Sequence, residues 1–142
     1  MRIRWSSDLE TGIRAIDLQH EELIGMLNEL DAAYSGGCEQ FVLESVLQRL
    51  GAYAEFHFGT EESLMATLPR SEQHAEEHLR QHRGFMEQLS RMRAASSQDA
   101  PQTMGILIDF LNQWLYEHIL KSDRNLGALL NQKIANSRTQ KM

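Results

Sequence analysis

The sequence YAEFHFGTEESLM, residues 53–65, decides the fold and the chemistry expected of this chain. If it is helical, His57 and Glu61 are four residues apart and lie on one face, about one turn from each other. Apolar residues continue that face on both sides of the pair: Leu43, Val46, Leu47, Leu50, Tyr53, Ala54, Leu64 and Met65. A buried carboxylate is costly unless it is paired or bound to a metal. The stretch therefore indicates either a hydrogen-bonded polar pair or a metal site within a helical core.

Length and composition limit the possible classes of protein. The chain has 142 residues, of which 42% are hydrophobic and 24% charged, as in a globular single domain with a sizeable core. A net charge of −6 without a Lys/Arg cluster argues against nucleic acid as a partner. We expect no membrane association, because no run of about 18 apolar residues and no secretory segment is present. The single cysteine, Cys38, excludes an intrachain disulfide, so we expect a cytoplasmic protein.

Hydrophobic periodicity extends the helical pattern along most of the chain. Gly36-Gly37 and Pro69 mark the ends of two helices, and Pro101 suits the first turn of another. Asp17 is a plausible N-cap for the first helix. We expect helices at about residues 17–34, 39–66, 71–95 and 101–130. Four helices with short connections predict an all-α, up-down-up-down four-helix bundle.

The remaining segments suggest a simple domain organisation. Residues 1–16 have no helical period but contain Trp5 and Leu9, so we expect an ordered N-terminal arm packed on the bundle. Residues 17–130 form the expected bundle. Residues 131–142 are polar, and we expect a frayed C-terminal tail.

Each expected helix carries histidine on its apolar face: His20 on the first, His57 on the second, His78 with His82 on the third, and His118 on the fourth. A lone histidine at such a position is more often a hydrogen-bonded core residue than a ligand. Four separate polar clusters, however, would each need their own buried partners. One shared metal site accounts for all of them.

The types of donor constrain the metal. Histidines and carboxylates without a thiolate suit iron, zinc, copper or manganese. Five histidines and two carboxylates exceed the four ligands of a tetrahedral zinc ion. Seven ligands divide between two metals if both carboxylates bridge, which leaves room for one bridging oxygen and one open position. Because helical bundles host carboxylate-bridged di-iron centres, two irons are the leading choice.

Four motifs occur in order along the chain. They are Gln19-His20-x-x-Leu23, His57-Phe58-x-x-Glu61-Glu62-x-Leu64-Met65, His78-x-x-x-His82-x-x-Phe85 and Trp114-Leu115-x-x-His118-Ile119-x-x-x-Asp123. Together they resemble the motifs of the hemerythrins, and more narrowly of the bacteriohemerythrins. The resemblance extends from about Trp5 to Leu130.

This resemblance implies a set of ligands and a function. One iron would be held by His78, His82 and His118 and the other by His20 and His57, with Glu61, Asp123 and an oxo or hydroxo group as bridges. O2 would bind reversibly at the second iron, in a pocket formed by Leu115 and Trp114. The implied protein is an oxygen carrier, store or sensor and not an enzyme; its protein partner is not implied. The alternative is a di-iron enzyme or repair factor that handles O2, peroxide, nitric oxide or iron.

Two assignments depend on helical geometry. His74 and His78 have the same spacing as His78 and His82, but the apolar face through Phe85 favours the later pair. Asp123 follows His118 by five residues, about 140° away on an ideal helix, and Ser122 occupies the four-residue step. We assign Asp123 by its match to the motif.

Overall fold

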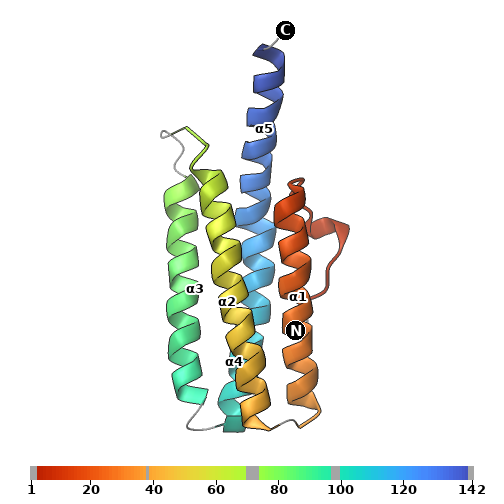
Figure 1. The fold of residues 1–142 in the computed structure, drawn as a ribbon, viewed down its shortest axis with the longest axis vertical. Helices are drawn as coiled ribbons and strands as arrows, with labels where there is room; N and C mark the ends of the chain where they lie inside the picture. The colour runs from red at the N-terminus through yellow and green to blue at the C-terminus, as the bar shows by residue number, and fades with distance from the viewer. Residues whose placement is uncertain (1–2, 38, 70–73, 97–99, 141–142) are drawn as a thin grey trace.

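The computed structural model describes residues 3–37, 39–69, 74–96 and 100–140 and is an antiparallel helical bundle (Figure 1). Its helices are α1 (Arg14–Ser35), α2 (Gln40–Met65), α3 (His74–Ser96) and α4 (Ala100–His118), the last of which continues through a π-helical turn, η2 (Ile119–Asp123), into α5 (Arg124–Gln140). A short 3-10 helix, η1 (Ser7–Leu9), precedes them. No strand occurs within the described residues. The prediction of an all-α four-helix bundle is confirmed.

The start of α1 differs from the prediction. The helix begins at Arg14, so Asp17 lies in its first turn and is not the N-cap. The Asp17 carboxylate instead accepts hydrogen bonds from the backbone N–H of Thr11, at 2.9 Å, and from its hydroxyl, at 2.8 Å. It thus fixes the turn that leads from the arm into α1. The predicted start of α3 at residue 71 lies outside the described residues.

The last helix is longer than expected. We expected it to end near Leu130, but α5 continues to Gln140 and extends beyond the other helices (Figure 1). Residues 131–140 contain neither Gly nor Pro, so nothing in their sequence stops the helix. Lys133 also donates a hydrogen bond from Nζ to the backbone carbonyl of Thr67, at 2.8 Å. The division into an arm, a bundle and a tail stays a prediction.

The apolar interior consists of two cores, with polar residues between them. The larger core contains Leu23 and Ala54 together with most of the buried residues towards the α1–α2 connection. The smaller core is formed by Ile16, Met65, Leu126 and Leu130. In each helix, the inward-facing histidines and carboxylates come between residues of the two cores. Both ends of the polar layer are therefore closed to water.

The N-terminal arm is packed against the bundle. The backbone N–H of Ile3 donates to the buried Asn112 side chain in α4, at 2.9 Å, and Leu9 is fully buried. Further along, Thr11 lies directly against Gly127 of α5.

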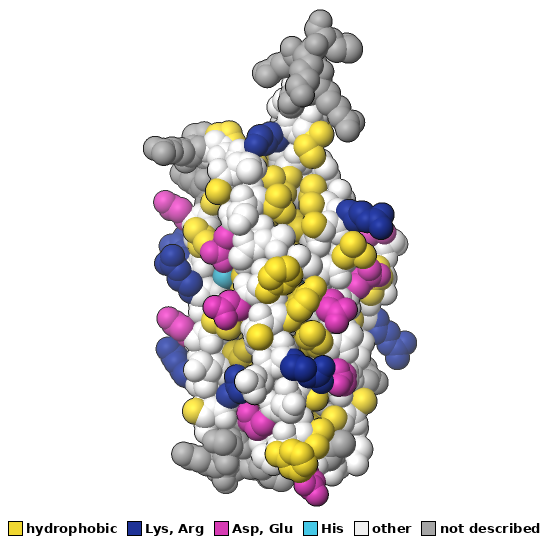
Figure 2. Space-filling model, in the orientation of Figure 1, with side chains coloured by type: hydrophobic (Ala, Val, Ile, Leu, Met, Phe, Trp, Pro, Cys, Tyr) yellow, Lys and Arg dark blue, Asp and Glu magenta, His cyan; other side chains and the backbone are white. Residues whose placement is uncertain are grey.

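The surface is mixed in charge. On the face shown in Figure 2, Lys and Arg side chains alternate with Asp and Glu, and hydrophobic side chains lie between them. In the part of the chain that the structure describes, no helix has the length and apolarity needed to cross a membrane.

The contact between Thr11 and Gly127 yields a test of this packing. A methyl group at Gly127 would overlap the Thr11 backbone carbonyl, so Gly127→Ala should lower the free energy of unfolding by about 1–3 kcal/mol. Gly84 also lies within a helix, but a Cβ there meets no neighbour. Gly84→Ala should therefore raise the same free energy by roughly 0.5–1 kcal/mol. Urea denaturation of the two variants measures both changes, and equal effects would contradict the packing of the arm on α5.

Candidate metal centre

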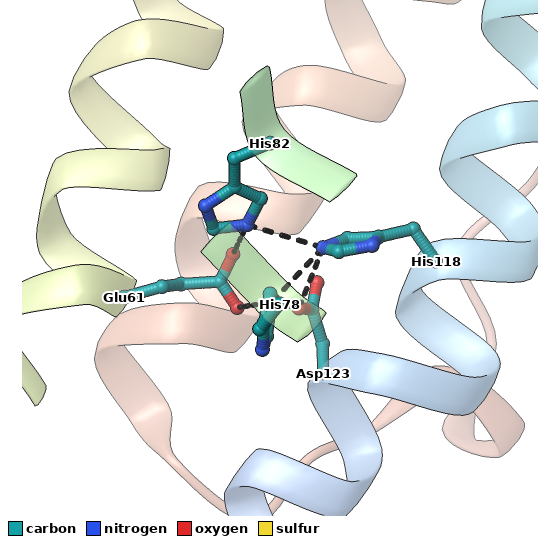
Figure 3. Close-up of side chains that lie close together, drawn as sticks. All are labelled: Glu61, His78, His82, His118 and Asp123. Carbon is teal, nitrogen blue, oxygen red and sulfur yellow. Dashed lines mark hydrogen bonds and ion pairs between the residues drawn. The ribbon is translucent and has the colours of Figure 1, made fainter. Parts of the chain in front are cut away.

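Seven side chains from all four helical segments meet in the polar layer. Their donor atoms form two groups, and within each group every atom lies within 4.8 Å of the others. The first group is Glu61, His78, His82, His118 and Asp123 (Figure 3), and the second is His20, His57, Glu61 and Asp123. The two carboxylates belong to both groups. All seven side chains are buried, with no more than 4% of any residue exposed.

Asp123 is the centre of one set of short contacts. Its Oδ1 lies 2.8 Å from Nε2 of His78 and 3.1 Å from Nε2 of His118. Its Oδ2 lies 2.8 Å from Nε2 of His20. One carboxylate thus faces histidines of both groups, which is the position that a bridging ligand requires.

Glu61 has the equivalent position on α2. Its Oε1 lies 3.1 Å from Nε2 of His57 and 3.3 Å from Nε2 of His82. Its Oε2 lies 3.8 Å from Nε2 of His78. All five histidines therefore direct Nε2 towards the carboxylates.

The other ring nitrogen of three histidines has an acceptor outside the cluster. Gln19 Oε1 lies 2.7 Å from Nδ1 of His57, and Gln81 Oε1 lies 2.8 Å from Nδ1 of His118. Glu62 Oε2 lies 3.2 Å from Nδ1 of His82. Because an amide or carboxylate oxygen only accepts, the proton of each neutral ring is on Nδ1. The lone pair on Nε2 is then free for a cation.

Burial keeps these imidazoles neutral. It lowers the pKa of His57 from 6.5 to about 3 and that of His82 to about 2, with the neighbouring His20 and His118 rings adding to the respective shifts. Burial also lowers the pKa of His118. Metal binding requires the neutral ring, so no proton has to be displaced from these three side chains near pH 7.

The two carboxylates differ in their proton affinity. Burial, followed by the adjacent Asp123 carboxylate, raises the pKa of Glu61 well above its ordinary value. Burial also acts to raise the pKa of Asp123, but the interaction with His118 and a hydrogen bond with Glu61 outweigh it and hold that pKa well below the usual value. Without a cation, the pair therefore tends to keep one proton, on Glu61.

The cluster is electrostatically unsatisfied by protein atoms alone. Nε2 of His118 lies 3.0 Å from Nε2 of His78 and 3.2 Å from Nε2 of His82. Because the neutral rings of His82 and His118 carry their protons on Nδ1, their Nε2 lone pairs point at each other. None of the carboxylate oxygens of Glu61 and Asp123 has a hydrogen-bond donor of good geometry in the described residues. Buried polar atoms without partners are rare in folded proteins. Cations among these atoms would remove both defects, so the residues fit a metal centre.

A π-helical turn explains how Asp123 reaches the cluster. The backbone N–H of Arg124 donates to the carbonyl of Ile119, five residues earlier, so the turn holds one more residue than an α-helical turn. The extra residue rotates Asp123 onto the face that carries His118. The five-residue step is thus compatible with a shared site, although an ideal α-helix would not allow it.

His82 lies inside the cluster and His74 lies outside it. His74 is half-buried at the start of α3, where its Nε2 is 2.9 Å from Nδ1 of His78. Its Nδ1 lies 3.0 Å from the side-chain nitrogen of Asn125. The structure therefore brings together the seven residues favoured by the sequence and places His74 behind one of them.

Comparison with known proteins bears on the nature of this cluster. Residues 11–130 match the family model described as the hemerythrin HHE cation binding domain. The chain belongs to this family. It is similar to bacteriohemerythrins from Pseudomonas aeruginosa, 33% identical over 121 residues, and from Stenotrophomonas maltophilia, 31% identical over 124 residues. These alignments cover 84% of this chain and 75% and 76% of the two relatives. A bacteriohemerythrin from Clostridium acetobutylicum is 27% identical over 127 residues, which are 84% of this chain and 95% of that protein.

A small apolar cavity adjoins the cluster of this hemerythrin-family protein. Its volume is about 10 Å³, and its walls are Leu23, Leu27, Leu50, Ala54, Phe58, Phe85, Leu111, Trp114 and Leu115. Two of these residues cover histidines directly. The Trp114 ring stacks on His118 with centroids 4.4 Å apart, and the Phe58 ring stacks on His82 at 3.9 Å. The predicted pocket residues Trp114 and Leu115 thus both line an apolar space beside the candidate ligands.

Sequence reasoning did not find the outer partners of the histidines. Gln81 and Glu62 are polar residues on amphipathic helices and look like ordinary surface positions. Gln19 occurs within a motif, but nothing in its spacing indicates that it contacts His57, which is 38 residues away. Only the packing of one helix against another reveals these contacts.

The lowered pKa values predict acid sensitivity of the metal-free protein. His57, His82 and His118 stay neutral when folded, whereas the unfolded chain takes up a proton at each near pH 6.5. Glu61 offsets one of these protons, because its raised pKa retains a proton in the folded state.

The free energy of unfolding should therefore fall by about 2–3 kcal/mol per pH unit around pH 5.5. Urea denaturation in the presence of a chelator, followed by circular dichroism at pH 7.5, 6 and 5, measures this slope. Constant stability between pH 7.5 and pH 5 would show that these imidazoles are not buried as described.

Proposed function

We propose that the chain binds O2 reversibly at a pair of iron ions, as a carrier, store or sensor of oxygen. The observation that carries this proposal is the placement of five histidines and two carboxylates in two overlapping groups that share both carboxylates. In this arrangement His78, His82 and His118 would hold one iron, and His20 and His57 the other. Glu61 and Asp123 would bridge them, together with an oxo or hydroxo group.

The donor set favours binding over turnover. A pair of ferrous ions supplies the electrons that O2 needs in order to bind. Five histidine nitrogen donors would occupy most positions around the metals, and we expect substrate-oxidising di-iron centres to have more carboxylates and fewer histidines. The bacteriohemerythrin relatives support the same choice. We therefore propose a non-enzymatic protein; a di-iron enzyme or repair factor for O2, peroxide, nitric oxide or iron is the alternative.

The protein's own residues would protect the site. The cavity next to the cluster is lined by apolar side chains, including Leu115 and Phe58, and its volume of about 10 Å³ is at the lower limit for one small molecule. O2 is small and uncharged, so apolar walls admit it while they disfavour water and ions. Excluding water and protons slows irreversible oxidation.

Location and partners follow the same reasoning. We propose a cytoplasmic protein, on the basis of its single cysteine. Its ligand would be O2, with neither nucleic acid nor a membrane as partner.

Iron analysis of two histidine variants tests the ligand set. His118→Ala removes a donor from the first group, so the protein purified with ferrous iron should lose about one of two irons per chain. His74→Ala changes the same residue type outside the cluster and should keep both irons and an unchanged absorption spectrum. Loss of iron from the His74 variant, with retention in the His118 variant, would contradict the assignment.

Oxygen titration of the ferrous protein tests the function. We expect uptake of one O2 per iron pair, with absorption that disappears under vacuum and returns with oxygen. Sustained consumption of O2 in the presence of a reductant, or ready transfer of iron to an acceptor, would support the alternative instead.

Two leucine-to-alanine substitutions test whether the cavity protects the site. Leu115→Ala opens space beside the cluster and should speed irreversible oxidation of the oxygenated protein several-fold. Leu47→Ala is the matched control, because this leucine is fully buried but does not line the cavity. Each change should cost about 2–5 kcal/mol of stability. Absorption spectra recorded over time measure the oxidation rate of each variant. Equal rates in the two variants would show that the cavity does not protect the site.

A further inference from the structure

We propose that Gln81 is a positioning residue that holds Asp123 in the metal centre, acting through the His118 ring and the Ser122 hydroxyl. The inference rests on the proposed metal centre and names the residue that holds the π-helical turn in place. Gln81 is on α3, whereas the residues that it fixes are on α4 and η2.

The contacts of Gln81 carry this proposal. Its Oε1 accepts a hydrogen bond from Nδ1 of His118, at 2.8 Å, and a second from Oγ of Ser122, at 2.6 Å. A single amide oxygen has two lone pairs and can accept both. The two donors precede and follow the start of the π-helical turn, so Gln81 ties both ends of that turn to α3.

The position of Ser122 explains why this tie matters. In an uninterrupted α-helix, Ser122 would follow His118 by four residues and share its face. In the structure, the π-helical turn moves Asp123 onto that face, and Ser122 is displaced sideways towards Gln81. The bond from Ser122 to Gln81 is made in this π-helical arrangement. It therefore stabilises the conformation that presents a carboxylate, in place of a hydroxyl, to the cluster.

The His118 contact has a separate effect. Gln81 fixes the proton on Nδ1 and thereby leaves the Nε2 lone pair directed at Asp123, at 3.1 Å. Gln19 has the same role towards His57, but its second hydrogen bond is donated to the Thr60 hydroxyl on α2, which is a regular α-helix. Of the three outer partners Gln19, Glu62 and Gln81, Gln81 is the one that is hydrogen-bonded to the π-helical turn that supplies Asp123.

Three substitutions separate the acceptor role from simple packing. Gln81→Met keeps the length of the side chain but removes the acceptor. Gln81→Glu restores an oxygen that accepts both hydrogen bonds. Gln113→Met is the matched control, because Gln113 is exposed on α4 and contacts only Glu117 among the described contacts.

Three measurements apply to each protein at pH 7.5. Anaerobic titration with ferrous iron against a competing chelator gives affinity and stoichiometry. Nitrogen-15 NMR of the metal-free protein gives the tautomer of His118, and hydrogen exchange of the Arg124 amide reports the π-helical bond to Ile119.

We expect Gln81→Met to weaken binding of one iron about 10–100-fold, to populate both tautomers of His118 and to speed exchange at Arg124. Gln81→Glu and Gln113→Met should remain within a few-fold of the unmodified protein. Wild-type affinity, tautomer and exchange in Gln81→Met would overturn the proposal, as would failure of Gln81→Glu to restore them.

Ser122→Ala keeps the test decisive if Gln81→Met does not fold. This variant should speed hydrogen exchange at the Arg124 amide and weaken iron binding, while the His118 tautomer stays unchanged. If neither the exchange rate nor the iron affinity changes, the proposal is overturned. If the unmodified protein binds no iron pair, the proposed function fails. The two NMR measurements on metal-free protein would still decide whether Gln81 holds the turn.

Discussion

The rest of the structure depends on the burial of two carboxylates and five imidazoles between two apolar cores. Each of these groups would cost free energy if it were buried alone. Their Nε2 and carboxylate oxygen atoms converge within 4.8 Å in each group, so bound cations can satisfy all of them together. Residues on each side of this layer, such as Leu23 and Leu126, keep water away from it. Stability and function are thus linked, because the arrangement that suits a metal is unfavourable without one.

The bundle directs these donors through two devices beyond regular helices. A π-helical turn brings Asp123 onto the face of His118, and residues outside the cluster fix the protons of the histidine rings. Both devices act before any metal binds. They lower the cost of organising the ligands, because the imidazoles are already neutral and oriented. Gln81 combines the two roles at the junction of α3 and η2.

Much of this could be predicted from sequence, because helical periodicity and spacing are local properties. The four helices and the inward histidines follow from steps of three and four residues, and the choice of His82 over His74 followed from the apolar face through Phe85. The geometry of Asp123 could not be predicted in this way, since a π-helical turn has no clear local signal. The predicted end of the last helix near Leu130 is wrong, because α5 continues to Gln140. The polar composition of residues 131–140 indicates fraying, but these residues include no helix breaker. Contacts such as Gln81 with His118 depend on helix packing and were not found.

Anomalous diffraction at the iron edge, from crystals of protein loaded with ferrous iron, tests the central claim most directly. We expect two iron positions per chain, both between Glu61 and Asp123, with His78, His82 and His118 around one and His20 and His57 around the other. A single metal position, or two irons bound away from these carboxylates, would contradict it.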